Sequence, residues 1–133
     1  MKDIPIDLNK DSGEPHFEND TMVAVKSNNL KDNTLIGSYV IIPKPEVGSP
    51  FELTDKEWAD SKALMLEVKK YVDAKYSPDG YNIGWNVGEV AGQSVAHAHM
   101  HIIPRYADEP YAGKGLRYWF KKPENIRASL KED

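Results

Sequence analysis

At 133 residues, 40% hydrophobic and 29% charged, the chain is long enough to bury a core as one globular domain, and its composition excludes a disordered protein. No apolar run approaches the roughly 20 residues of a membrane span and the first residues lack a secretory signal, so we expect no membrane partner. The net charge of −4 disfavours nucleic-acid binding, and the lack of cysteine excludes thiolate sites and favours a cytoplasmic protein.

The first half of the chain predicts two strands. Residues 1–16 are polar, with a glycine and a proline near their end, and are expected to form a loose lead-in. Residues 21–25 and 38–42 are rich in β-forming side chains, and a polar loop over 27–33 separates them. We expect Pro43 to end the second strand, because proline cannot donate a hydrogen bond to the sheet.

The clearest predicted element is a helix that begins after Thr54. Glu57 stands three residues later, at the spacing of a capping box. Apolar and small residues then recur at helical spacing and predict a face turned toward the core: Trp58, Ser61, Met65, Val68 and Val72. A proline and a glycine within residues 77–80 should end the helix.

Two more strands follow the helix, over residues 81–85 and 95–103, and Pro104 is expected to close the second of them. Strands on both sides of one long helix predict an α+β fold, with the helix on one face of an antiparallel sheet. Because we find neither repeats nor a low-complexity linker, we expect a single domain over residues 1–133, with 106–133 as a C-terminal tail.

Three of the four histidines alternate within five residues, at His97, His99 and His101. In a strand, side chains alternate between two faces, so the three imidazoles would share one face while the residues between them face the core. Packing alone explains this pattern poorly, because imidazoles fill a core badly and repel one another when protonated. The pattern therefore points to chemistry.

Two chemical interpretations remain open. A metal site is one, although the outer two histidines of a straight strand stand roughly 13 Å apart, whereas zinc–nitrogen bonds are about 2 Å long. Nucleophilic catalysis is the other, because a neutral imidazole can attack phosphorus near neutral pH. The preceding loop supports the second interpretation: Gly92 allows close backbone approach, and neutral donors for phosphate oxygens are available from Asn86, Gln93 and Ser94.

These residues resemble a known signature. The pattern Asn86-x-Gly88, followed by Ala91-Gly92-Gln93-Ser94-Val95-x-His97-x-His99-x-His101-Ile102-Ile103-Pro104-Arg105, looks like that of the histidine-triad (HIT) superfamily. The earlier segment Gly37-x-x-Val40-Ile41-Ile42-Pro43-Lys44 is similar to the second recognisable segment of that family. The resemblance implies a five-stranded antiparallel sheet with one long helix and a shorter helical segment, paired as a homodimer into a ten-stranded sheet.

The resemblance also implies an activity. A small nucleotide substrate, either a dinucleoside polyphosphate such as diadenosine tetraphosphate or a nucleoside phosphoramidate, would transfer its nucleotidyl group to His99 and release a nucleoside monophosphate, with no metal or other cofactor. The His97 carbonyl would accept the Nδ1–H of His99 and leave Nε2 free to attack. His101 would lie against a phosphate oxygen or the leaving group. The phosphate would be held by Asn86, Gln93 and Ser94.

Two positions depart from the family pattern. Ser38 stands where a histidine often partners the first histidine of the triad, although its hydroxyl can still hydrogen-bond His97. The acidic residue expected near the ribose is replaced by Ser27-Asn28-Asn29, in which Asn28 is a candidate. These departures motivate a second hypothesis, a nucleotide-binding module with little catalysis, and a histidine-liganded metal protein is the third.

The tail contains a basic and aromatic stretch over residues 114–122. We favour a solvated, charge-mixed segment whose aromatic side chains pack against the body or a dimer partner. The alternatives are that Arg117 steers an anionic ligand, that the segment covers the leaving-group side of the site, or that an aromatic ring stacks on a nucleobase.

Overall fold

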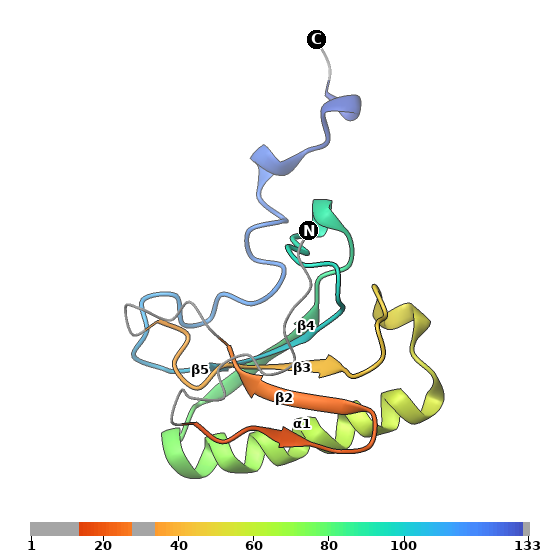
Figure 1. Cartoon of the computed structure of the whole chain (residues 1–133). Coiled ribbons are helices and arrows are strands. Elements are labelled where there is room, and N and C mark those ends of the chain that lie inside the picture. The colour runs from red at the N-terminus through yellow and green to blue at the C-terminus, as the bar shows by residue number, and fades with distance from the viewer. Residues whose placement is uncertain (1–13, 28–33, 132–133) are drawn as a thin grey trace.

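The computed structural model describes residues 14–27 and 34–131, and these form an α+β fold with one antiparallel sheet (Figure 1). The sheet contains β1 (Phe17–Glu18), β2 (Met22–Lys26), β3 (Tyr39–Pro43), β4 (Gly80–Trp85) and β5 (Met100–Arg105), and the helix is α1 (Asp55–Tyr76). The spatial order of the strands is β1-β2-β3-β5-β4. Short 3-10 turns lie at η1 (Pro50–Glu52), η2 (Glu89–Ala91), η3 (Pro123–Asn125) and η4 (Ala128–Leu130).

Helix α1 begins as the sequence predicts. The Glu57 amide donates to the Thr54 hydroxyl at 3.1 Å, and the Glu57 carboxylate accepts from the Thr54 amide at 2.7 Å, which completes the capping box. At the other end, Ser77 adopts a left-handed conformation (φ 49°) as the C-cap, directly before Pro78. The predicted stop signal is confirmed.

The buried face of α1 differs from the predicted one. It consists of Glu57, Ser61, Leu64, Val68 and Val72. Glu57 is buried because its side chain folds back onto the cap. Trp58, expected to face the core, is 43% exposed and packs edge-on against Trp85 at a centroid distance of 5.9 Å. Met65 is only half-buried.

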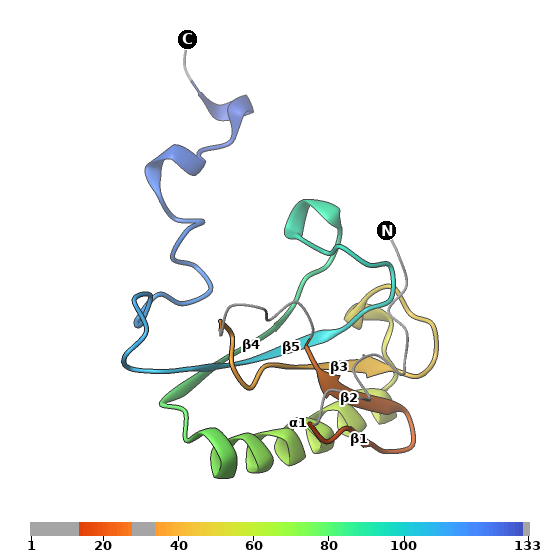
Figure 2. The same ribbon diagram turned by 60° about the vertical axis from the view of Figure 1, so that its left-hand side comes forward.

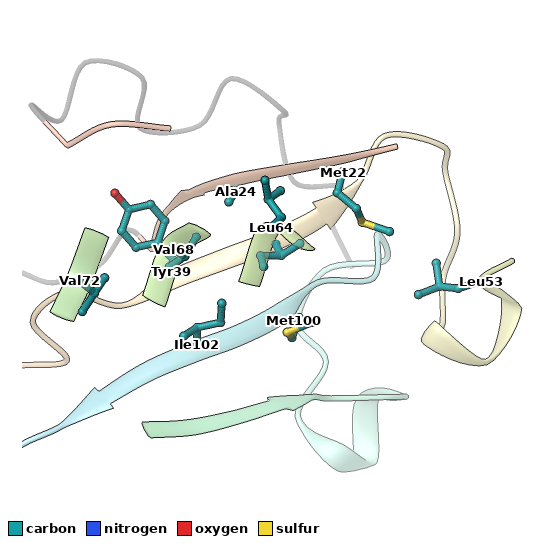
Figure 3. Packing of buried hydrophobic residues seen from close by; sticks show 10 residues of the cluster. Met22, Ala24, Tyr39, Leu53, Leu64, Val68, Val72, Met100 and Ile102 are labelled. Atoms are coloured by element: carbon teal, nitrogen blue, oxygen red, sulfur yellow. The ribbon is translucent and has the colours of Figure 1, made fainter. Parts of the chain in front are cut away.

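The two faces of the sheet have different environments. On one face, side chains of β2, β3 and β5 pack against the helix in a continuous core (Figure 3): Met22, Ala24, Tyr39, Ile41, Met100 and Ile102 meet Leu64, Val68 and Val72. The opposite face carries a second buried cluster of Val23, Val25, Val40 and Ile42. His101 pairs with Val40 across β3 and β5, and paired residues share a face. His101 therefore lies on the face turned away from α1.

The last strand begins and ends later than predicted. Residues 95–99 were expected to be strand, but β5 starts at Met100, because the Ala98 amide donates to the carbonyl of Val47 in a neighbouring loop at 2.8 Å. Pro104 was expected to close the strand, yet β5 continues to Arg105. The ladder with β3 stops at Ile102, so the missing amide proton of Pro104 costs no bond to β3.

Two further observations complete the fold. Strand β1 was not predicted, and with two residues it is too short to leave a periodic pattern in the sequence. Within the described residues, no helix combines the length and hydropathy that a membrane span requires. The loop candidate Asn28 lies outside the described residues.

The described chain begins with a clamp on the C-terminal end of α1. The Glu14 carboxylate accepts hydrogen bonds from the hydroxyls of Tyr71 and Tyr76 and from Lys75 Nζ. Burial alone would raise the pKa of Glu14, but these donors together outweigh it and lower the pKa to about 2. The clamp therefore stabilises the fold while Glu14 is ionised.

We predict that Glu14→Gln lowers the free energy of unfolding by about 2 kcal/mol near pH 7. Because the pKa of Glu14 is lower in the folded chain than its ordinary value of 4.5, the contribution is present above 4.5 and is lost as the pH falls toward 2. Urea denaturation at pH 7 and at about pH 3.5 should show the difference between the two proteins shrinking with acidification. Glu67→Gln, on the exposed surface of α1, is the control. Equal effects of the two substitutions would contradict the clamp.

Candidate functional site

The segment before β5 orients the central histidine. His99 Nδ1 lies 3.0 Å from the carbonyl oxygen of His97. A carbonyl only accepts, so this contact requires a proton on Nδ1 of a neutral ring and leaves the lone pair on Nε2. The geometry matches the contact that the family resemblance implies. Both His97 and His99 are buried, 6% and 8% exposed respectively.

His97 is itself held by the end of β3. Its Nε2 lies 2.6 Å from the carbonyl oxygen of Pro43, so Nε2 is the donor. The suggested hydrogen bond between Ser38 and His97 is wrong: the Ser38 hydroxyl is buried without a partner among the described residues. The Pro43 carbonyl accepts the hydrogen bond from His97 for which Ser38 was the candidate. A pattern of side chains in the sequence could not have revealed an acceptor that belongs to the backbone.

His101 is the second residue of β5, and its ring faces that of His99. Their rings meet edge-to-face at a centroid distance of 4.8 Å. Burial, with a smaller contribution from His99, lowers the pKa of His101 below its ordinary value of 6.5. Within the described part of the chain, its buried Nε2 has no hydrogen-bond partner. His101 is therefore a neutral imidazole at neutral pH with one ring nitrogen uncommitted.

Gln93 connects the loops around the triad. Its Oε1 accepts from the Gly88 amide at 2.8 Å, and its Nε2 donates to the carbonyls of Gly48 and Ala96 at 3.1 and 3.3 Å. Both amide protons are thus engaged with backbone, and the side chain is 5% exposed. Direct phosphate contact by Gln93 stays a prediction, while the observed bonds give it a positioning role.

Asn86 and Ser94 are both exposed and lie on the connection between β4 and β5, whose exposed part is called the rim here. Ser94 lines a shallow hollow of 410 Å³ together with Glu89, Gly92 and Gln93. Gly92 adopts φ +99°, and a Cβ added there would stand 3.6 Å from Asn86 Nδ2. The 3.6 Å contact alone would admit a side chain, but the left-handed φ favours glycine at this position. Among the described residues, no hydrogen bond ties Asn86 or Ser94 to the buried network.

A larger, mainly apolar cavity of 730 Å³ lies away from the triad. Its lining includes Leu35, Ile36, Tyr76, Pro104 and Tyr106, which places it at the far end of β5. Volume alone therefore does not identify the candidate site. In the described part of the chain, no group of three or more metal-ligating side chains is arranged to hold a metal ion, so the metal hypothesis gains no support from the geometry.

Arg105 is a residue whose task the sequence did not reveal. Its guanidinium donates to the Asn82 side chain, the Glu109 carboxylate and the carbonyls of Tyr111 and Lys114. Arg105 is thus a half-buried anchor for the segment that follows β5. Arg117, by contrast, is exposed as predicted.

Comparison with known proteins gives consistent matches. The family model described as "HIT domain" matches residues 16–108. The chain is similar to an adenosine 5′-monophosphoramidase of Schizosaccharomyces pombe, with 36% identity over 69% of this chain and 66% of that protein. It is also similar to an asymmetrical bis(5′-nucleosyl)-tetraphosphatase of the same organism, with 38% identity over 58% of this chain and 42% of that protein.

The fold has a matching relative among solved structures. A crystal structure of a HIT family protein from Bacillus anthracis has a TM-score of 0.62 and 29% identity, covering 69% of this chain and 63% of that one. The matched segment of this chain spans less than two thirds of the length of each of the two curated relatives.

The hydrogen bonds of Gln93 lead to a prediction about the free energy of unfolding. Gln93→Ala removes three hydrogen bonds to the backbone of Gly48, Gly88 and Ala96, and should lower the free energy of unfolding by about 2 kcal/mol. Ser94→Ala, one residue further at the exposed rim, should change it by less than about 0.5 kcal/mol. Thermal or urea unfolding measures both. A Gln93→Ala protein as stable as Ser94→Ala would show that the network is not formed.

Proposed function

The chain belongs to the HIT domain family, and we propose that it is a nucleotide hydrolase in which His99 attacks the α-phosphorus of a nucleoside 5′-phosphate derivative. The observation that carries this proposal is the hydrogen bond from His99 Nδ1 to the His97 carbonyl. The bond presents the unprotonated Nε2 as the nucleophile, and it can also stabilise the positive charge that the ring acquires on attack.

The first chemical step follows from this arrangement. His99 Nε2 forms a bond to phosphorus while the bond from phosphorus to the leaving group breaks. Phosphoryl transfer depends mainly on positioning and on stabilising charge at the phosphate oxygens. The rings of His101 and His99 lie 4.8 Å apart, centroid to centroid, and we assign the buried, unpartnered Nε2 of His101 to a contact with a phosphate oxygen or the leaving atom.

The loop residues complete the site. Asn86 and Ser94 supply neutral donors from the rim, and Gln93 fixes the loop on which they lie. Water then attacks the phosphorus, the bond from phosphorus to His99 Nε2 breaks and returns its electron pair to Nε2, and the nucleoside monophosphate leaves as the proton of water passes to solvent. The names of two relatives, an adenosine 5′-monophosphoramidase and a bis(5′-nucleosyl)-tetraphosphatase, support nucleotides as the substrate class and leave phosphoramidates and dinucleoside polyphosphates as the two alternatives.

The assembly that we propose is a homodimer with a ten-stranded sheet. Strand β4 lies at one end of the sheet, and among the described residues it pairs only with β5. Its free edge can accept the β4 of a second copy in an antiparallel arrangement. The cytoplasmic location expected from the composition stays a prediction.

A nucleotide-binding module with little catalysis is the second candidate. The observation that favours it is Ser38, whose buried hydroxyl has no partner among the described residues and cannot carry a positive charge as a histidine would. In that case the protein would bind nucleoside monophosphates without turning over either class of substrate.

The proposed nucleophile makes a kinetic prediction. His99→Ala should reduce kcat for adenosine 5′-phosphoramidate by at least about 1,000-fold, because it removes the attacking atom. Binding of AMP, measured by calorimetry, should weaken only a few-fold. His16→Ala removes the exposed fourth histidine and is the matched control, which should retain full activity. Turnover by His99→Ala at the rate of the control would rule out His99 as the nucleophile.

A further inference from the structure

The mainly apolar cavity at the far end of β5 is built from three separate parts of the chain. Its lining comes from residues 34–36 before β3, from Tyr76 at the end of α1, and from residues 104–106 and 108–111 at the end of β5 and beyond it. Figures 1 and 2 show these three segments at the same end of the sheet. The volume of 730 Å³ lies within the range of roughly 300–1,000 Å³ that is usual for small-molecule sites.

Contacts within the chain hold the walls of this cavity in place. The Tyr106 hydroxyl donates to the carbonyl of Ile36 at 2.8 Å, which ties the segment after β5 to the segment before β3. Between them, Gly37 has φ +86°, and a Cβ there would lie 3.1 Å from Tyr76 Cδ2 and 3.2 Å from Pro104 Cγ. Glycine therefore lets these walls approach one another. The cavity is formed by the chain itself, as small-molecule sites usually are.

Leu35 lines the cavity in an unfavourable backbone conformation. Its φ is +52°, in the left-handed region that leucine rarely adopts, and its side chain is 49% exposed. The Ser38 amide donates to the Leu35 carbonyl at 3.1 Å and closes the turn. The apolar side chain is thus held at the cavity at a backbone cost, without being buried by the chain. Residues strained in this way cluster at ligand sites.

The charges of the lining leave one carboxylate unpaired. Arg105 and Glu109 neutralise each other, because Nη2 and Nε of Arg105 donate to the Glu109 carboxylate at 2.5 and 2.8 Å. Asp108 is exposed and forms no ion pair with any residue in the described ranges. The lining therefore carries one net negative charge beside apolar walls. This charge favours a cationic group on a ligand and repels an anionic one.

Two of the tyrosines that line the cavity already have a cation against the ring. Lys75 Nζ lies 5.3 Å from the ring centroid of Tyr76, and Lys114 Nζ lies 4.6 Å from that of Tyr111. Neither lysine belongs to the lining. A second cation at either ring would be repelled by the first, whereas an aromatic ring can pack against it. The walls therefore suit an aromatic ring, and Asp108 suits a positive charge attached to that ring.

We propose that this cavity is a second binding site, for a small aromatic molecule that carries a protonated amine. The ring would lie against Leu35, Ile36 and the tyrosines, and the ammonium group would pair with Asp108. The six residues of β5 span about 17 Å, so the site lies at the opposite end of the strand from His99. The inference goes beyond the proposed function, and binding here would leave the nucleotide site free.

The test uses three ligands that share one ring system and differ in charge. Calorimetry on the full chain at low ionic strength compares naphthylethylamine, naphthylethanol and naphthylacetate. The amine should bind at one site per chain, about threefold more tightly than the alcohol, and the carboxylate should bind most weakly. In methyl NMR spectra, the signals of Leu35 and Ile36 should shift during the titration. Saturating AMP should leave the affinity for the amine unchanged.

Two variants separate the charge from the apolar wall. Asp108→Asn should weaken binding of the amine about threefold and leave that of the alcohol unchanged. Leu35→Asn should weaken both about tenfold, because it removes an apolar wall. It should not lower the free energy of unfolding, because asparagine tolerates the left-handed backbone. Glu124→Gln, at an exposed acidic residue of η3 outside the lining, is the matched control and should change neither affinity.

Each outcome decides the proposal. Equal affinity for the three ligands, or equal effects of Asp108→Asn and Glu124→Gln, would overturn it, because Asp108 would then not select the ligand. Absence of amine binding would overturn it as well. Displacement of the amine by AMP would place the ligand at the nucleotide site and contradict a second site. If Leu35→Asn unfolded more easily than the unaltered chain, Asp108→Asn and its control would decide alone.

Discussion

The hydrogen bond from His99 to the carbonyl of His97 is the constraint on which the site depends. A regular strand directs its carbonyls sideways to its neighbours, where they are used in the ladder. Here the two residues precede β5, and the Ala98 amide between them is bonded to Val47. The departure from strand geometry is what leaves the His97 carbonyl available to a side chain, and so sets the tautomer of the proposed nucleophile.

The rest of the fold maintains that short irregular segment. Pro43, at the end of β3, accepts from His97, and Gln93 joins the loops on either side through three backbone groups. Behind these contacts, the packing of α1 against β2, β3 and β5 holds the strands in register (Figure 3). His101 lies on the face of the sheet turned away from α1, and His99 meets its ring. The packing on α1 and the proposed chemistry therefore belong to opposite faces of the sheet.

Local sequence patterns predicted where the helix begins and ends better than they predicted which residues contact one another. The capping box at Thr54 and the end of α1 were readable from the sequence, because each depends on residues close together in the chain. The strand predicted over residues 95–99 did not form, so only His101 of the three histidines lies in β5. The exposed Trp58, the Pro43 acceptor for His97 and the anchoring by Arg105 were not readable, because each depends on a partner far away in sequence or on a backbone atom.

The most direct test of the account is to trap the intermediate on His99. The chain is mixed with adenosine 5′-phosphoramidate, quenched within milliseconds in alkaline denaturant to protect the phosphorus–nitrogen bond, and analysed by intact-protein and peptide mass spectrometry. The account predicts one added AMP group on the peptide that contains His99, which forms and decays as fast as AMP is released. Release of AMP without an adduct, or an adduct on another residue, would contradict it.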